Sequence, residues 1–465
     1  MMGQLPAAQN ALFYEFSLEQ HIPNDHLLRL IDQFLDFDSI RQYLTPYYSH
    51  TGRPSVDPEL MIRMLLVGYC YGIHSERRLC EEVNLNLAYR WFCRLGLEDA
   101  VPDHSTFSKN RHGRFRESDL LRYVFNTVLT RCIEEDLVGG EGFAIDASFV
   151  RADVARQRYE HSPVDWTPSK RQSRAAKEYL ELLDQDEALH RPQKSVSLTD
   201  PMAQWTGAKG PANFFYSTNY LIDVDNNVIM DVEASPSTNK LEVDTTHTMI
   251  ERVEANHGIR PDRLMGDTAY GAADNLAYLV DEKQIEPHIP VFEKINRKDG
   301  TFSRCDFEWD AGADEYRCPA GKLLRSRRRN FKNQRSLVTK ANTIIYRSRA
   351  RDCRQCPMKQ QCCPNMSFRK ITHSIHEAAR DVARAITRSD TYIDVSVRQR
   401  KKVEMLFAHM KRHLRFDRLR LRGLHCANDK FLLVATVQNL RRLAKLRSQP
   451  PPGSGVTAPD ILKMA

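Results

Sequence analysis

Two aspartates stand in apolar segments that have the length of β-strands. Asp146 lies in the middle of FAIDASFV, and Asp267 ends RLMGD. A carboxylate in such a place must be paired, hydrogen-bonded or bound to a metal, because burying an unpaired charge costs several kcal/mol. For one aspartate, a helix cap or a buried ion pair is the commoner explanation. Two aspartates on strands of one sheet make a shared metal ion an equally good one.

A third acid, Glu404, lies in a segment whose apolar residues have helical spacing, from about residue 395 to 414. Arg400 precedes it by four residues and Lys411 follows it by seven, so all three share one face of the helix. An acid flanked by two cations suits a metal ligand beside a phosphate group. The alternative is a surface ion pair between Arg400 and Glu404, which is worth only a few tenths of a kcal/mol and requires no cation at position 411.

The cysteines offer a second candidate metal site. The chain has 11 cysteines, an odd number, and its first residues lack the form of a signal peptide, so a disulfide framework is not expected. Cys318, Cys353, Cys356 and Cys362 (or Cys363) have the spacing of a structural zinc site with four thiolates. The alternative is a set of reduced thiols without metal.

Charge points to a polyanion as partner. The 465 residues carry a net charge of +8, but residues 321–354 carry +11 and residues 398–447 carry +12, so the rest carries −15. Two basic blocks of this density favour nucleic acid over a merely solvated surface. No uncharged apolar stretch reaches the roughly 18 residues of a membrane span, so no membrane partner is expected. The phosphate-loop, dinucleotide and GxSxG motifs are absent, which disfavours those chemistries.

The candidate residues lie in regions whose sequences predict different secondary structure. Residues 1–136 predict short helices, with caps at Asp57 (followed by Pro58), Ser75 and Asp103, which suits a DNA-binding module or a generic helical bundle. Residues 137–300 alternate strands and helices around a hairpin turn at 225–227, after a polar excursion at 153–200 with one exposed helix at 168–189. The fold class is therefore α/β with a mixed sheet.

The remaining regions complete the predicted domain order. Residues 301–375 are a basic, Cys-rich insertion, and residues 376–447 return to the core as C-terminal helices, with segments at 395–414 and 429–446. Residues 448–465 are rich in Pro, Gly and Ser and predict a flexible tail.

Several of these pieces together resemble a bacterial insertion-sequence transposase of the DDE type. They are AIDASFV around Asp146, GDTAYGAADN around Asp267 and RQRKKVEMLFAHMKRHLRF around Glu404. The last fits the family's Tyr-x2-Arg-x3-Glu-x6-Lys signature, with Val397 at the tyrosine position as a departure. LTDPMA at 198–203 also resembles this group, and the helical segment that begins PELMIRMLL resembles its transposase-associated N-terminal domain. The resemblance covers about residues 40–447.

The resemblance implies an RNase H-like, retroviral-integrase-like core. In it Asp146, Asp267 and Glu404 would hold two Mg²⁺ (or Mn²⁺) ions, and Arg400 and Lys411 would grip DNA phosphates. It also implies double-stranded DNA as partner, both element ends and target, a homodimer or larger assembly on DNA, and a place in the bacterial cytoplasm at the nucleoid. Some relatives stack an aromatic residue on an extruded base, a role open to Trp309, although a core tryptophan is the usual reading.

Two other functions remain open at this stage. One is an RNase H-like, metal-dependent nuclease that cuts DNA without joining strands. The other is a transposase-derived DNA-binding protein without catalysis, which the presence of all three acids disfavours.

Overall fold

The computed structural model describes residues 16–49, 51, 55–185, 194–207, 211–236, 239–293, 300–326 and 336–447. Its chain forms two compact units. The first contains residues 1–140, 146–260 and 402–465, and the second contains residues 141–145 and 261–401. Strand β1 (Gly142–Arg151) and helix α16 (Val397–Arg412) each contain residues of both units. The predicted tail at 448–465 lies outside the described residues.

Short capped helices build the N-terminal part of the first unit. They are α1 (Leu18–His21), α2 (Leu27–Asp32), α3 (Phe37–Leu44), α4 (Pro58–Cys70), α5 (Glu76–Leu85), α6 (Leu87–Phe92), α7 (His104–His112), α8 (Arg114–Glu117) and α9 (Leu120–Glu134). The predicted caps are confirmed: side chains of Asp57, Ser75 and Asp103 accept backbone N–H groups at the starts of α4, α5 and α7. Every residue of α4 from Met61 to Cys70 is buried, so this helix is the centre of the bundle.

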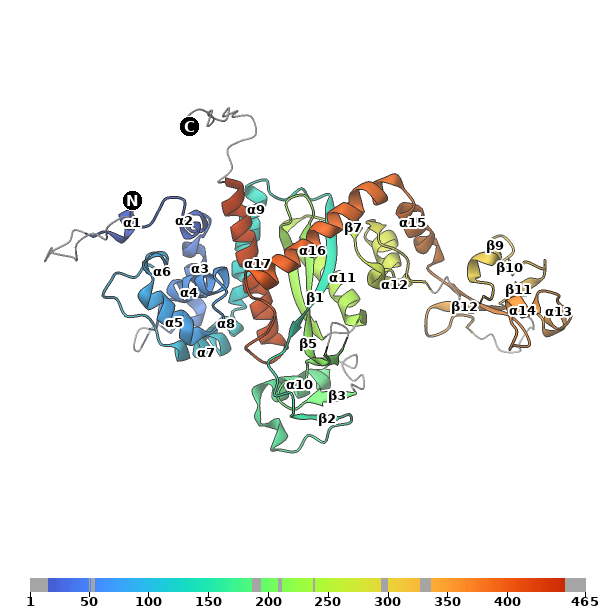
Figure 1. Cartoon of the computed structure of the whole chain (residues 1–465), viewed down its shortest axis with the longest axis horizontal. Coiled ribbons are helices and arrows are strands. Elements are labelled where there is room, and N and C mark those ends of the chain that lie inside the picture. The colour runs from blue at the N-terminus through green and yellow to red at the C-terminus, as the bar shows by residue number, and fades with distance from the viewer. Residues whose placement is uncertain are drawn as a thin grey trace, which may run out of the picture. The chain divides into compact units, whose positions relative to one another are not determined.

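Antiparallel strands and two long helices form the rest of the first unit's core. Strand β5 (Asn213–Asp223) pairs with β4 (Gln204–Thr206) and, through the predicted hairpin, with β6 (Ile229–Pro236). In the sheet β5 is also the neighbour of β1. Helix α17 (Leu424–Arg447) runs beside α9 and packs on β6 (Figure 1). Helix α11 (Asn239–His257) also packs on β6. The excursion contributes β2 (Tyr159–His161), β3 (Ser195–Ser197) and α10 (Arg174–Gln185).

Parallel strands open the second unit. The first residues of β1 pair with β7 (Arg263–Met265), and β7 pairs with β8 (Glu286–His288). The register joins Ala144 to Met265. Helices α12 (Ala273–Ala277) and α15 (Glu377–Thr387) pack against each other beside these strands. Parallel and antiparallel pairs thus both occur, and a mixed α/β fold with an N-terminal helical region is confirmed.

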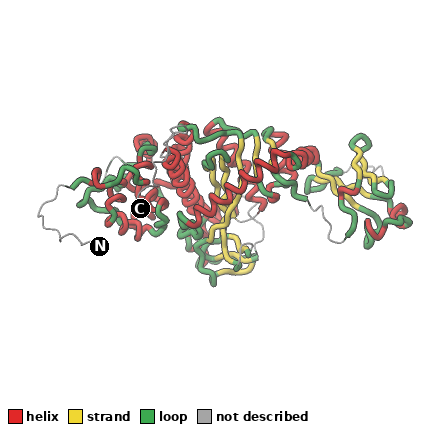
Figure 2. The backbone as a smooth tube through the Cα atoms, turned by 45° about the horizontal axis from the view of Figure 1, so that its top comes forward, coloured by secondary structure: helices red, strands yellow, loops and turns green. Residues whose placement is uncertain are grey.

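The Cys-rich segment of the second unit has a sheet of its own. The antiparallel order is β13 (Lys370–Ser374), β12 (Thr343–Arg347), β11 (Leu323–Arg325), β10 (Glu315–Arg317) and β9 (Glu308–Asp310), with α13 (Ala350–Arg354) and α14 (Lys359–Cys362) between β12 and β13. Figure 2 shows that strands and loops dominate this segment. Its core combines cysteines with aromatic residues such as Tyr316 and Tyr346.

The structure shifts several predicted boundaries. The helix predicted at 168–189 is α10, which begins at Arg174 after a 3-10 turn at Lys170–Gln172. It is not fully exposed as predicted, because one face buries Ala175, Ala176, Glu178 and Tyr179. The final helix begins at Leu424, directly after Gly423, rather than at residue 429. No described helix is long and apolar enough to cross a membrane.

Candidate functional site

Asp146 lies within β1, directly after the buried run Phe143–Ile145. Its side chain is half-buried, and its Oδ1 accepts the N–H of Ala147 at 2.7 Å. The prediction that this carboxylate stands within an apolar strand is confirmed. A strand backbone holds it in place, which suits a carboxylate that must present its oxygens in a fixed direction.

Asp267 occupies a different local structure from the predicted one. Strand β7 ends at Met265, and Asp267 is the cap of a 3-10 turn at Thr268–Tyr270, where its Oδ1 accepts the N–H of Ala269 at 2.8 Å. The side chain is exposed. A Cβ at the preceding Gly266 would lie 3.1 Å from Cγ2 of Ile145, so a larger residue there would require the Ile145 side chain to shift.

Glu404 projects from an exposed face of α16. The predicted apolar stripe is buried, at Val403, Leu406, Phe407 and Met410, and the Phe407 ring lies 5.4 Å from that of Tyr220 on β5. This packing fixes the helix, and therefore the direction of Glu404, within the first unit.

Arg400 and Lys411 are the two cations of the signature, and Arg400 does not form the surface ion pair with Glu404. Nη1 of Arg400 donates to the carbonyl oxygen of Gly266 at 3.4 Å, beside Asp267. Among the described residues no ion pair or hydrogen bond joins Arg400 to Glu404, so the alternative of a surface pair is not observed. Lys411 is half-buried further along α16.

The three acids are distributed over the two units. Asp146 and Glu404 belong to the first and Asp267 to the second. Within the part of the chain that the structure describes, no group of three or more His, Cys, Asp or Glu side chains is arranged to hold a metal ion.

The cysteine cluster is only partly assembled. Cys353, Cys362 and Cys363 are buried in one core, and Cys318 packs against it, whereas Cys356 is half-exposed outside that core. The turn after Cys318 is tight: the N–H of Lys322 donates to its Sγ at 3.2 Å. Burial raises the pKa of the Cys362 thiol to about 12, so without a metal this group is a neutral thiol.

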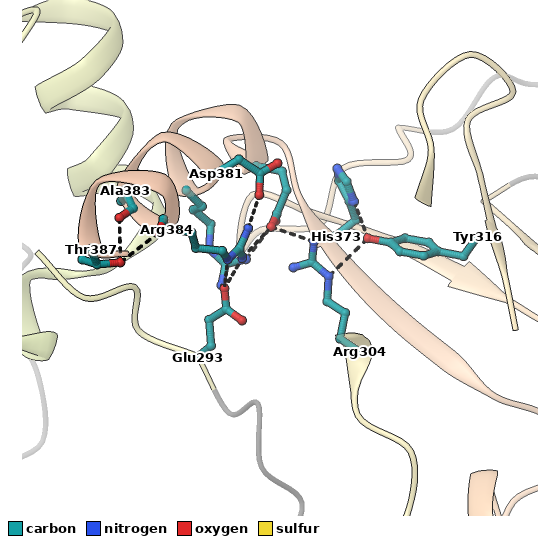
Figure 3. A network of polar contacts seen from close by, with 10 residues as sticks. Glu293, Arg304, Tyr316, His373, Asp381, Ala383, Arg384 and Thr387 are labelled. Carbon is teal, nitrogen blue, oxygen red and sulfur yellow. Dashed lines mark hydrogen bonds and ion pairs between the residues drawn. The ribbon is translucent and has the colours of Figure 1, made fainter. Parts of the chain in front are cut away.

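An ion-pair network that sequence reasoning missed stabilises the second unit (Figure 3). The Glu377 carboxylate on α15 contacts Arg304 at 2.6 Å and Arg380 and Arg384 each at 2.8 Å. Arg304 also donates to the Tyr316 hydroxyl of β10 at 3.2 Å. The network therefore ties the Cys-rich sheet to α15. Helical spacing could have paired Glu377 with Arg380 and Arg384 on α15, whereas the contacts of this helix with Arg304 and Glu293 join distant parts of the chain and required the fold.

Trp309 lies at the edge of this sheet. It is 37% exposed, and its ring lies 4.4 Å from that of His373 and 4.7 Å from that of Tyr316. It is thus neither a fully buried core residue nor isolated on the surface.

Comparison with known families defines the class of protein. Residues 16–113 match a transposase domain (DUF772), and residues 317–444 match a transposase DDE domain. The second match indicates an enzyme that cleaves and transfers DNA, of a class that generally uses divalent metal ions. Together the two matches support a DDE transposase of the insertion-sequence type. No solved structure matches it.

Proposed function

We propose that this transposase binds the terminal inverted repeats of its element, cleaves the DNA at their ends and joins the freed 3′ ends to target DNA. Asp146, Asp267 and Glu404 are its catalytic carboxylates. The observation that carries the assignment is the parallel register of β1 and β7. Asp146 and Asp267 each follow the Ala144–Met265 pair by two residues along the chain, Asp146 still within β1 and Asp267 in the turn directly after β7.

The donor set fits Mg²⁺ or Mn²⁺, because three carboxylates offer only hard oxygen ligands. Neither Asp267 nor Glu404 is ion-paired to a described residue, so neither carboxylate is committed to a cation of the protein. Two bound divalent ions would supply activation of the attacking oxygen and stabilisation of the leaving oxygen. The RNase H-like character of the core belongs to this proposal and rests on the DDE domain.

The chain's own cations would position the DNA. Arg400 is held at the carbonyl of Gly266 by one of its five N–H donors, which leaves others to contact a phosphate beside Asp267. Lys411, on the face of α16 that carries Glu404, would contact a second phosphate. In the first reaction water attacks the phosphodiester at the element's end and releases a 3′-OH. In the second, the oxygen of that 3′-OH forms a new bond to a target phosphorus and its proton is lost, while the target's own bond between phosphorus and the 3′-oxygen breaks. The target strand on the 5′ side of that phosphate therefore leaves with a free 3′-OH.

Three finer features belong to the same proposal. Because two element ends must be paired, the active species on DNA is a homodimer or a larger assembly. It acts on the bacterial nucleoid in the cytoplasm. A structural zinc ion is bound by Cys318, Cys353, Cys356 and Cys362 (or Cys363). This assignment is supported by one shared core, which contains or contacts all of these cysteines except Cys356.

Charge-neutral variants of the acids test the assignment. Asp146→Asn, Asp267→Asn and Glu404→Gln should each abolish Mg²⁺-dependent cleavage of DNA that carries the element's ends, while binding to those ends is retained. Asp244→Asn, an exposed carboxylate on α11, is the matched control and should cleave like the wild type. Full cleavage by any of the three variants would overturn that residue's role.

A further inference from the structure

A small cavity in the first unit is lined by three cationic side chains, of which Arg111 and Lys430 are buried and Arg420 is exposed. Its volume is about 200 Å³. It is lined by helix α4, the start of α5, Arg111 of α7, Arg420 in the segment before α17, and Lys430 of α17. None of the three candidate catalytic acids does. The cavity is therefore a feature separate from the proposed catalytic residues.

Lys430 is the most informative residue of the cavity. It is only 4% exposed. Among the described residues no hydrogen bond or ion pair satisfies its ammonium group. Burial, reinforced by the positive charge of Arg111, lowers the pKa of Lys430 to about 7. An ammonium group buried without a counter-ion is costly, so its retention needs a reason.

The other charged groups facing Lys430 do not neutralise it. Arg111 is 5% exposed and is ion-paired with Glu76, which commits the one carboxylate that lines the cavity. Arg420 adds a third cation. His74 is not a further charge, because burial lowers its pKa, and its Nε2 lies 2.6 Å from the carbonyl oxygen of Leu414. Cys426, which also acts on Lys430, is a neutral thiol because burial raises its pKa to about 11.

The local backbone adds a favourable field for an anion. Ser75 and Glu76 line the cavity, and Ser75 is the cap of α5, a helix of ten residues. The positive end of the helix dipole therefore lies at the cavity, as in many anion sites. Lys430 supplies the independent sign that this end serves a ligand.

A wider groove opens beside the cavity. It has a volume of about 840 Å³ and shares Ile73, His74, Ser75 and Arg420 with the cavity. Two more of its arginines, Arg151 and Arg415, are exposed and have no ion pair with a described residue. In contrast, Arg78 and Arg418 of the groove are paired with Glu82 and Asp153. Asp417 also lines the groove, so five arginines (Arg78, Arg151, Arg415, Arg418 and Arg420) face three carboxylates (Glu82, Asp153 and Asp417), and a net positive charge remains at the approach to Lys430.

We propose that this cavity is a phosphate-binding site in which Lys430 is the buried counter-charge. The phosphate is either a phosphodiester of DNA lying in the groove or a free phosphate ion. The site itself does not depend on the proposed function, whereas occupation by DNA rests on it.

Thermal unfolding with inorganic phosphate tests the site. At pH 7 and constant ionic strength, phosphate in place of chloride should raise the melting temperature of the wild type along a saturating curve. Lys430→Met nearly keeps the length of the side chain and removes the charge. This variant should fold, and its melting temperature should no longer show the saturating rise with phosphate. Lys177→Met, at an exposed lysine on α10, controls for general salt effects and should respond like the wild type. A phosphate response of Lys430→Met equal to that of the wild type would overturn the proposal, as would no saturating response in the wild type.

Binding to a DNA duplex separates the two sources of phosphate. If DNA occupies the cavity, Lys430→Met should weaken binding about 10- to 100-fold, the effect of losing a charge-assisted hydrogen bond, and lower the salt slope by about one. Arg420→Gln, at the rim, should weaken binding less. If free phosphate occupies it, Lys430→Met should lose the thermal response and bind DNA like the wild type. Both outcomes support the site. Neither measurement depends on DNA cleavage. A failed phosphate-binding test would therefore leave the proposed catalytic role of the three acids untouched, and a failed cleavage test would leave the phosphate site untouched.

Discussion

Neutralising Glu377 should loosen the connection between the Cys-rich sheet and α15. The residue is 7% exposed, and its two oxygens are shared by Arg304, Arg380 and Arg384. Glu377→Gln keeps the shape of the side chain and removes the charge. Arg380 and Arg384 would then keep Glu293 as a buried carboxylate partner, whereas Arg304 would have no carboxylate partner among the described residues.

The size of the effect follows from the pKa of Glu377. Burial alone would raise this pKa, but hydrogen bonds from Arg304 and Arg384 outweigh burial and lower it from 4.5 to about 2. A difference of about 2.5 pKa units corresponds to about 3 kcal/mol at about 1.4 kcal/mol per unit. Because the edge of the network reaches solvent at Asp381, we discount this to about 2 kcal/mol.

The same pKa fixes the pH range. The carboxyl group binds its proton more weakly in the folded state than in the unfolded state, so its contribution is complete above about pH 4.5. It is lost as the pH falls through 4.5 toward 2. Glu377→Gln should therefore differ from the wild type at neutral pH and converge with it near pH 2.

Hydrogen exchange read by mass spectrometry is the suitable assay, because it reports on residues 304–318 and 370–388 separately from the rest of the chain. At pH 7 Glu377→Gln should lower protection in both segments by about 2 kcal/mol. Asp381→Asn removes a carboxylate that is 68% exposed and paired with Arg384, and should change protection by less than about 0.5 kcal/mol. Equal effects of the two variants would refute the reasoning.

Three further predictions concern other residues. Asp200 is fully buried and accepts hydrogen bonds from Tyr216 at 2.6 Å and from Gly423 at 3.1 Å, so Asp200→Ala should lower the free energy of unfolding by about 2–3 kcal/mol. Burial raises its pKa to about 6, so its charge destabilises the folded state as the pH rises from about 4 to 6, and thermal unfolding of Asp200→Asn should lack that part of the pH dependence. Purified protein should contain one zinc ion per chain by elemental analysis, with the zinc lost in Cys318→Ser and retained in Cys80→Ser; zinc-free wild type would contradict the zinc proposal. Without multivalent anions, Lys430→Met should be more stable than the wild type at pH 6, and thermal unfolding should show the difference shrinking as the pH rises through 7 toward 10, because the wild-type lysine loses its unpaired charge. A constant difference over that range would exclude this explanation.

Local signals accounted for the parts of the structure that depend on near neighbours. The caps at Asp57, Ser75 and Asp103 were predictable because each side chain bonds a backbone N–H two or three residues away. The hairpin between β5 and β6 and the buried stripe of α16 were predictable for the same reason, since turn residues and helical spacing are local patterns.

What remained unpredicted depends on contacts between distant residues. The five-stranded sheet of the Cys-rich segment has strands of only three to five residues, too short for a periodic signal. In the sequence Lys430 looks like an ordinary surface lysine, and its burial follows from the packing of α17 against other elements of the first unit, α4 among them. Among the candidate site residues, the strand position of Asp146 was predicted. The cap at Asp267 was a missed local signal, because Asp267 bonds the N–H of Ala269 two residues further on, whereas the contact of Arg400 with Gly266 required the fold.

Joining of a pre-cleaved end is the most direct measurement of the central claim. A DNA fragment that ends in the element's free 3′-OH is incubated with a plasmid target, the enzyme and Mg²⁺, and joined products are counted. The wild type should join the 3′-OH to the target, and Asp146→Asn, Asp267→Asn and Glu404→Gln should not, although each still binds the fragment. Joining by any of these variants, or cleavage without joining by the wild type, would contradict the account of a transposase that acts through these three acids.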